Sequence, residues 1–182
     1  MPRETFQNFS LKFIDIMVGV VLGLGFQWWA DLREPWQYIA FIFVYLNLID
    51  YWIDYSPTLK RFPPKHEPDL IVHVFIGFTM FLLVYATRGT PLGFFLTFLV
   101  YRIADIWWTI NMRRDYRPEP KDLIFINTWL RFDIIEALGA GVLALATHAV
   151  AVPPLVLIIL FVVFRLLTRA LASVRYRKVF FA

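Results

Sequence analysis

Residues 91–111 read PLGFFLTFLVYRIADIWWTIN, a run of apolar and aromatic side chains interrupted by only two ionisable residues, Arg102 and Asp105. A helix needs about 20 mostly apolar residues to cross the hydrocarbon core of a membrane. Because hydrocarbon offers no water to the peptide groups, such a run is expected to be an α-helix, which bonds its peptide groups internally. The stretch therefore predicts a membrane-spanning helix that carries charge at membrane depth.

Five further stretches have the same character, at 13–30, 36–55, 70–87, 128–147 and 152–172. The chain has 182 residues, of which 59% are hydrophobic and 18% are charged, whereas soluble domains average about 25% charged residues. Little sequence remains between the spans for a soluble domain. We therefore expect an all-α polytopic membrane protein in which residues 1–182 form a single six-span transmembrane domain.

The basic residues outside the spans are distributed asymmetrically. The segments before the first span, after the second, after the fourth and after the last contain Arg3, Lys12, Lys60, Arg61, Lys65, Arg113, Arg114, Arg117, Lys121, Arg175, Arg177 and Lys178. The remaining segments contain only Arg33 and Arg88. Because loops rich in lysine and arginine stay cytosolic, both termini are expected in the cytosol. The net charge of +4 then reflects topology and contact with membrane lipids, with no nucleic-acid partner. We expect an integral protein of a prokaryotic cell membrane.

The spans resemble one another in a pattern that predicts internal repeats. Alternate spans contain FVYLNLIDYWIDY at 43–55, FLVYRIADIWWTI at 98–110 and FVVFRLLTRALAS at 161–173. Near the start of the 13–30 and 128–147 spans, Lys12-Phe13-Ile14-Asp15 resembles Arg131-Phe132-Asp133, and a glycine follows each aspartate by eight residues, Gly23 and Gly141. Parallel repeats are common in membrane folds. The chain is therefore predicted to consist of three helix-hairpin repeats.

Ionisable residues inside the spans form a predicted layer toward the cytosolic side. They are Asp15, Asp50, Asp54, Arg102, Asp105, Arg131, Asp133, Glu136, Arg165 and Arg169. Because charge at bilayer depth is costly, each is a candidate functional residue. Two interpretations stay open. The acids, which outnumber the arginines, could line a cytosolic vestibule that attracts cations, or the layer could consist of ion pairs between helices.

Small residues in two spans indicate close helix packing. Gly19 and Gly23 form a GxxxG motif, and Ala137 and Gly141 give the 128–147 span a similar face. Such residues let helix backbones approach closely in lipid. The contact could lie within one subunit, or the first span could pack against a copy of itself in a homo-oligomer.

Several chemistries lack their residues in this sequence. There are no cysteines, which excludes thiolate metal sites and thiol nucleophiles. No lysine lies in a span, and there is no G-x-S-x-G, HExxH or P-loop motif. His73 and His148 are expected at opposite membrane faces, which disfavours a haem held by both. We therefore expect no enzyme activity, no cofactor and no metal centre.

The start of the first span resembles the transmembrane-protein-175 family of six-span FSD-motif potassium channels. The resemblance is carried by Phe13-Ile14-Asp15, with isoleucine in place of the motif serine, and by Trp52 near the cytosolic end of the second span. It implies an oligomer in which the first span lines a hydrophobically constricted pore. The implied pore-lining residues are Val20, Leu24 and Gln27.

These patterns predict an oligomeric channel for monovalent cations, with potassium as the candidate ion. The motif and polar network would comprise Phe13, Asp15, Asp50, Trp52, Arg102, Asp105, Arg131, Asp133 and Glu136. The alternative is a small transporter or lipid-handling protein that uses the inner charged layer as a binding site. A membrane scaffold whose charges only pair is a third interpretation.

Overall fold

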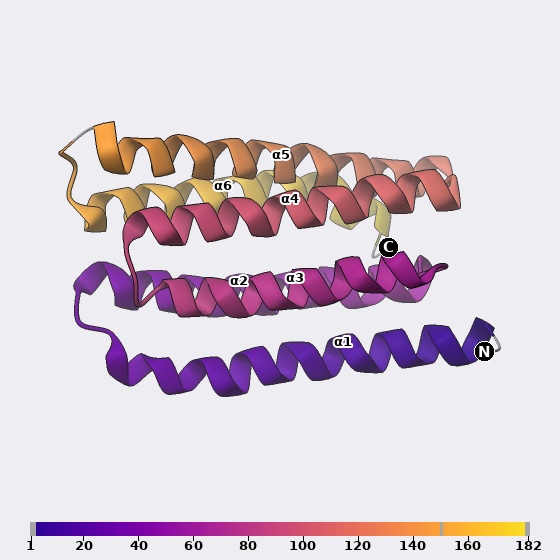
Figure 1. Cartoon of the computed structure of the whole chain (residues 1–182). Coiled ribbons are helices and arrows are strands. Elements are labelled where there is room, and N and C mark those ends of the chain that lie inside the picture. The colour runs from indigo at the N-terminus through magenta and orange to yellow at the C-terminus, as the bar shows by residue number, and fades with distance from the viewer. Residues whose placement is uncertain (1–2, 150, 181–182) are drawn as a thin grey trace. The chain divides into compact units, whose positions relative to one another are not determined.

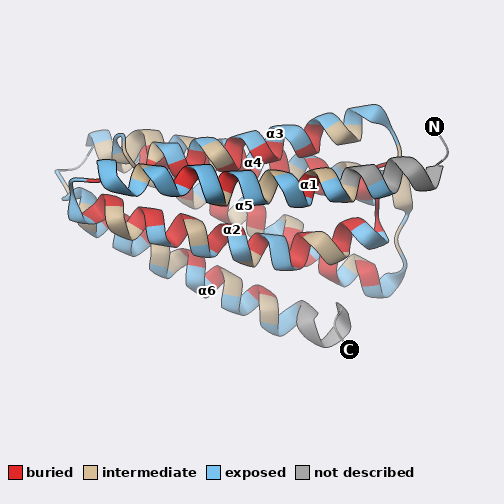
Figure 2. Ribbon diagram, turned by 90° about the horizontal axis from the view of Figure 1, so that it is seen from below, coloured by how far each residue is buried: buried red, intermediate tan, exposed pale blue. Residues whose placement is uncertain are grey.

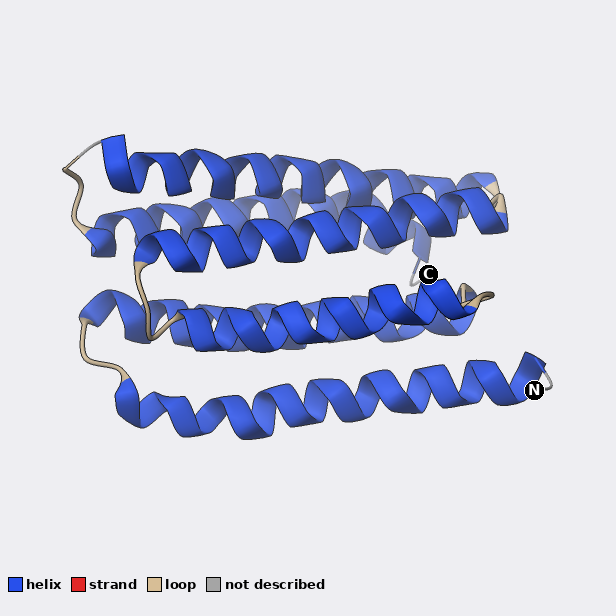
Figure 3. Cartoon of the chain, in the orientation of Figure 1, coloured by secondary structure: helices blue, strands red, loops and turns tan. Residues whose placement is uncertain are grey.

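The computed structural model describes residues 3–149 and 151–180, and within these ranges the chain is helical with no β-strand (Figures 1 and 3). The elements are α1 (Arg3–Phe26), η1 (Gln27–Asp31), α2 (Pro35–Arg61), α3 (Glu67–Ala86), α4 (Pro91–Tyr116), α5 (Pro120–Ala149) and α6 (Pro154–Phe180). The topology prediction used Arg3, Arg177 and Lys178, whose side chains lie outside the part of the chain that the structure describes. The all-α prediction is confirmed.

Four stretches are long and apolar enough to cross a membrane: Leu11–Asp31, Glu67–Ala86, Pro91–Tyr116 and Pro154–Arg175. These stretches indicate an integral membrane protein. The two remaining helices, α2 and α5, are as long, but both contain acidic residues in their central turns, which lowers their hydropathy. That α2 and α5 also cross the membrane stays a prediction, as do the three hairpin repeats.

Helix boundaries follow from local sequence signals. Prolines begin α2, α4, α5 and α6, where the missing proline N–H costs no helical hydrogen bond. At the start of α2 the Gln37 side chain accepts hydrogen bonds from the backbone N–H groups of Arg33 and Glu34. The Thr90 hydroxyl caps α4 by accepting from Gly93 N at 3.1 Å. At its other end α4 stops at Arg117, which has a left-handed backbone with φ of 45°.

The chain divides into two compact units, residues 1–89 and 90–182. In the first unit α1 packs against α2 and α3, and it buries Ile14 and Val21. Glycine permits this contact at Gly77, where an added Cβ would lie 3.0 Å from Met17 Cε. The Tyr45 hydroxyl donates to Leu22 O at 2.7 Å and ties α2 to α1.

In the second unit α5 packs against both α4 and α6. Its aromatic core contains Phe94, Phe95, Phe98 and Phe161, all with no exposed surface and with rings in edge-to-face contact. Polar side chains from all three helices meet beside this core. The second unit therefore holds the largest part of the predicted charged layer.

Candidate functional site

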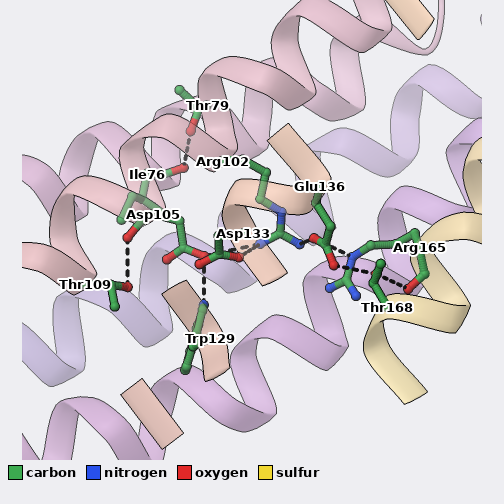
Figure 4. Close-up of polar contacts among 10 residues, drawn as sticks. All are labelled: Ile76, Thr79, Arg102, Asp105, Thr109, Trp129, Asp133, Glu136, Arg165 and Thr168. Atoms are coloured by element: carbon green, nitrogen blue, oxygen red, sulfur yellow. Dashed lines mark hydrogen bonds and ion pairs between the residues drawn. The ribbon is translucent and has the colours of Figure 1, made fainter. Parts of the chain in front are cut away.

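An ionic network joins the three helices of the second unit (Figure 4). Arg102 of α4 lies at its centre, with its guanidinium nitrogens 3.2 Å from Asp105 Oδ2, 3.1 Å from Asp133 Oδ1 and 2.7 Å from Glu136 Oε2. Arg165 of α6 contacts the same Glu136 oxygen at 3.1 Å through Nε. Glu136 therefore lies between two arginines that come from different helices.

Neutral side chains complete the network. The Trp129 indole donates to Asp105 Oδ2 at 3.1 Å, and the Thr168 hydroxyl donates to Glu136 Oε1 at 2.7 Å. The guanidinium carbon of Arg102 lies 4.8 Å from the centre of the Tyr101 ring, within the range of a cation–π contact. Trp129 and Thr168 thus supply hydrogen-bond donors to the buried carboxylates, and the Tyr101 ring gives Arg102 a polarisable surface where water is excluded.

The network is buried and acidic. Arg102, Asp105, Asp133 and Glu136 are each at most 3% exposed, and Arg165 is 8% exposed. Three carboxylates face two guanidinium groups, so the fully ionised network carries a net negative charge. Asp133 Oδ2 has no hydrogen-bond partner among the residues that the structure describes. A buried charge is costly unless it is compensated, and the described hydrogen bonds leave this carboxylate oxygen uncompensated.

The residues of the network share one spacing on each helix. Phe98, Arg102 and Asp105 on α4 follow the order i, i+4, i+7, which places side chains on one helical face. The same spacing recurs in Trp129, Asp133 and Glu136 on α5, and in Phe161, Arg165 and Thr168 on α6. The sequence analysis missed Tyr101, Trp129 and Thr168 as network members. This recurring spacing is the signal that could have identified Trp129 and Thr168.

Two polar contacts of the first unit involve residues that the sequence analysis considered. Trp52 Nε1 of α2 donates to Asp15 Oδ1 of α1 at 3.0 Å. This contact joins the two residues on which the resemblance to FSD-motif channels rests. The buried His73 of α3 hydrogen-bonds the Tyr55 hydroxyl through Nδ1. Neither pair is part of the ionic network of the second unit.

Val20 and Leu24 lie on an exposed face of α1, and the exposed Gln27 follows at the start of η1. We call this surface the α1 stripe, and the exposed turns of α1 are pale blue in Figure 2. The members of this stripe form two adjacent rows at four-residue spacing, Lys12, Ile16, Val20 and Leu24 in one and Asp15, Gly19, Gly23 and Gln27 in the other. Val20 is 41% exposed and Leu24 is 52% exposed. A Cβ added at Gly19 or Gly23 would meet nothing within 4 Å. The GxxxG motif therefore makes no close contact within the described part of this chain.

The other predicted residues are dispersed. Phe13 and Asp50 are partly buried, and Arg131 is exposed on α5. Asp54 is buried, Arg169 is partly buried, and Gly141 has open space around the position of a Cβ. The described residues contain no group of three histidine, cysteine or acidic side chains arranged to hold a metal ion.

No family model, no curated protein and no solved structure matches this chain.

Proposed function

We propose that the protein is an oligomeric channel for monovalent cations in which α1 of each copy lines an axial pore. The observation that carries the proposal is the α1 stripe, which combines an exposed carboxylate, two exposed glycines and a run of exposed apolar residues on one face. Of the four membrane-compatible stretches, Leu11–Asp31, which covers most of α1 together with η1, is the least buried, at 17%. It has the most surface left for contact with other copies.

The order of residues along the stripe fits a pore. Asp15 lies toward the cytosolic end, where its exposed carboxylate would concentrate cations. Val20 and Leu24 follow as apolar constrictions, and Gln27 ends the stripe with an amide. Facing lipid, Asp15 and Gln27 would be costly to solvate. Facing a water-filled axis, both would be hydrated.

The glycines account for how copies would approach one another. Gly19 and Gly23 are four residues apart on the stripe and have no neighbour within 4 Å of an added Cβ. Small residues at this spacing allow close contact between helices from different copies. The resemblance in Phe13-Ile14-Asp15 and Trp52 makes potassium the first ion to test.

The ionic network has a supporting role in this proposal. Asp105, Asp133 and Glu136 are enclosed and face arginines, so a vestibule open to the cytosol relies on Asp15. The network instead fixes α4, α5 and α6 against one another. The inner charged layer thus includes both an ion-paired interior in the second unit and an exposed carboxylate on α1.

Flux into liposomes tests the proposal, with potassium, sodium and chloride compared at equal gradients. The purified chain is expected to conduct cations and not chloride, and Leu24→Asn is expected to raise the flux because it hydrates a constriction. Leu46→Asn is the matched control, since Leu46 is a similarly exposed leucine, 63% exposed, on α2. Flux no greater than in empty liposomes, or equal effects of the two variants, would contradict the pore assignment.

A second candidate function is a small transporter or lipid-handling protein with its binding site in the charged layer. The excess of carboxylates and the unbonded Asp133 Oδ2 favour it. In that case the protein is a monomer in mild detergent, and Asp133→Asn abolishes cation or proton uptake while Leu24→Asn leaves uptake unchanged. An oligomer whose flux survives Asp133→Asn argues for the channel instead.

A further inference from the structure

A polar pocket of about 250 Å³ lies at the basic end of the second unit, separate from the ionic network. It is lined by Ile124, Asn127, Thr128 and Arg131 of α5 and by Arg175 of α6. Sites for drug-sized ligands measure about 300–1,000 Å³. A pocket at the lower end of this scale fits a small charged group rather than a large organic molecule.

The lining is cationic and rich in hydrogen-bond donors. Its two arginines have no acidic partner among the side chains that the structure describes, and no acidic residue lines the pocket. Arg131 is two residues from Asp133, yet it is exposed while Asp133 is buried in the network. Guanidinium groups bind phosphate oxygens through paired hydrogen bonds. Asn127 and Thr128 add an amide donor and a hydroxyl.

The pocket also lies at the membrane depth expected for a site that contacts lipid headgroups. Arg175 follows the apolar run of α6 and begins the basic cluster that continues in the sequence with Arg177 and Lys178, so it belongs at the boundary between hydrocarbon and headgroups. The positive-inside distribution places this boundary at the cytosolic leaflet, where basic pockets between helices bind anionic headgroups. Ile124 is 44% exposed at the edge of the pocket and offers an apolar surface to an acyl chain.

We propose that this pocket binds a phosphate group, with Arg131 and Arg175 as the two cationic contacts. The phosphate of an anionic lipid headgroup and free inorganic phosphate share the chemistry that the pocket recognises. The proposal does not depend on the channel function, because the pocket contains none of the residues of the α1 stripe.

Native mass spectrometry of the full chain in neutral detergent tests this binding, with short-chain phosphatidylglycerol and inorganic phosphate titrated separately. We expect Arg131→Gln/Arg175→Gln to weaken binding at least tenfold. The control Arg113→Gln/Lys121→Gln removes the same charge from exposed positions on the same side and is expected to weaken binding less than twofold. Arg131→Lys is expected to fall between wild type and Arg131→Gln, because lysine keeps the charge and loses the paired donors.

The two titrations identify the source of the phosphate. Tighter binding of phosphatidylglycerol than of inorganic phosphate supports a lipid headgroup, and the reverse order supports free phosphate. Equal losses in the pocket and control variants would overturn the proposal, since general surface charge would then explain binding. Failure of both probes to bind would also overturn it. If the double variant does not fold, as judged by circular dichroism, Arg175→Gln alone serves, because Arg175 is exposed near the end of α6.

Discussion

Replacing Glu136 with leucine is expected to destabilise the second unit more than any single change at the surface. The substitution removes one carboxylate that lies 2.7 Å from Arg102 Nη2 and 3.1 Å from Arg165 Nε, and it also removes the acceptor of the Thr168 hydroxyl. Two buried guanidinium groups then lose a counter-charge. Breaking a buried ion pair by removing one partner costs about 3–5 kcal/mol, and we expect a loss in that range.

The milder variant Glu136→Gln separates charge from hydrogen bonding. Glutamine keeps a single acceptor oxygen, which can replace either Oε2 beside the two arginines or Oε1 beside Thr168, and it loses the negative charge. Hydrogen bonds to charged groups contribute about 1.5–3 kcal/mol each, so we expect a loss within this range and below that of leucine. The control is Glu119→Gln in the loop before α5, where the side chain is exposed and the expected change is within about 0.5 kcal/mol.

The free energy of unfolding is measured in detergent micelles by titration with a denaturing detergent, followed by far-ultraviolet circular dichroism. A double-mutant cycle with Arg165→Met isolates the coupling between the two side chains. Because Arg165 contacts Glu136 directly, the two losses should not add, and the double variant should be more stable than the sum predicts. A loss below about 1 kcal/mol for Glu136→Leu, or strict additivity in the cycle, would refute the assignment of a buried ionic network.

Glycine substitutions give two further predictions. A Cβ at Gly139 would lie 2.5 Å from Phe164 Cε1, so Gly139→Ala should lower the unfolding free energy by about 1–3 kcal/mol. Gly141→Ala meets nothing within 4 Å and should raise it by up to about 1 kcal/mol through helix propensity; equal effects in the same denaturant titration would refute this packing. Gly19→Leu and Gly23→Leu should leave the secondary structure unchanged and reduce the oligomeric mass in light scattering. An unchanged mass would argue against contact through the α1 stripe.

The helices themselves could be predicted from the sequence, because apolar length and proline positions determine where they lie. The 152–172 prediction begins within two residues of α6, which starts at Pro154. Helix ends were less predictable. The 128–147 prediction misses the first turns of α5, which begins at Pro120, because a helix can continue beyond its apolar stretch.

The partners of the charged residues could not be predicted in the same way. The spacing in the sequence places Arg102 and Asp105 on one face of their helix and Asp133 and Glu136 on one face of theirs. It does not show the rotation and register of one helix against another. Those quantities decide that Arg102 and Arg165 share one Glu136 oxygen. The sequence also does not predict the contact between Tyr55 and His73, because this contact depends on how α2 packs against α3.

The distinction between charges that are paired in the interior and charges that are exposed indicates which residues are available to bind a ligand. Moving Glu136 or Arg102 out of the network would break buried ion pairs at about 3–5 kcal/mol, so these residues serve better to hold helices than to exchange ligands. Asp15 and the two pocket arginines form no buried ion pair among the described residues, since the hydrogen bond from Trp52 leaves the Asp15 carboxylate exposed. A ligand that approaches them replaces water instead of an ion pair. For this reason the proposals for cations and for phosphate both use side chains that the network leaves out.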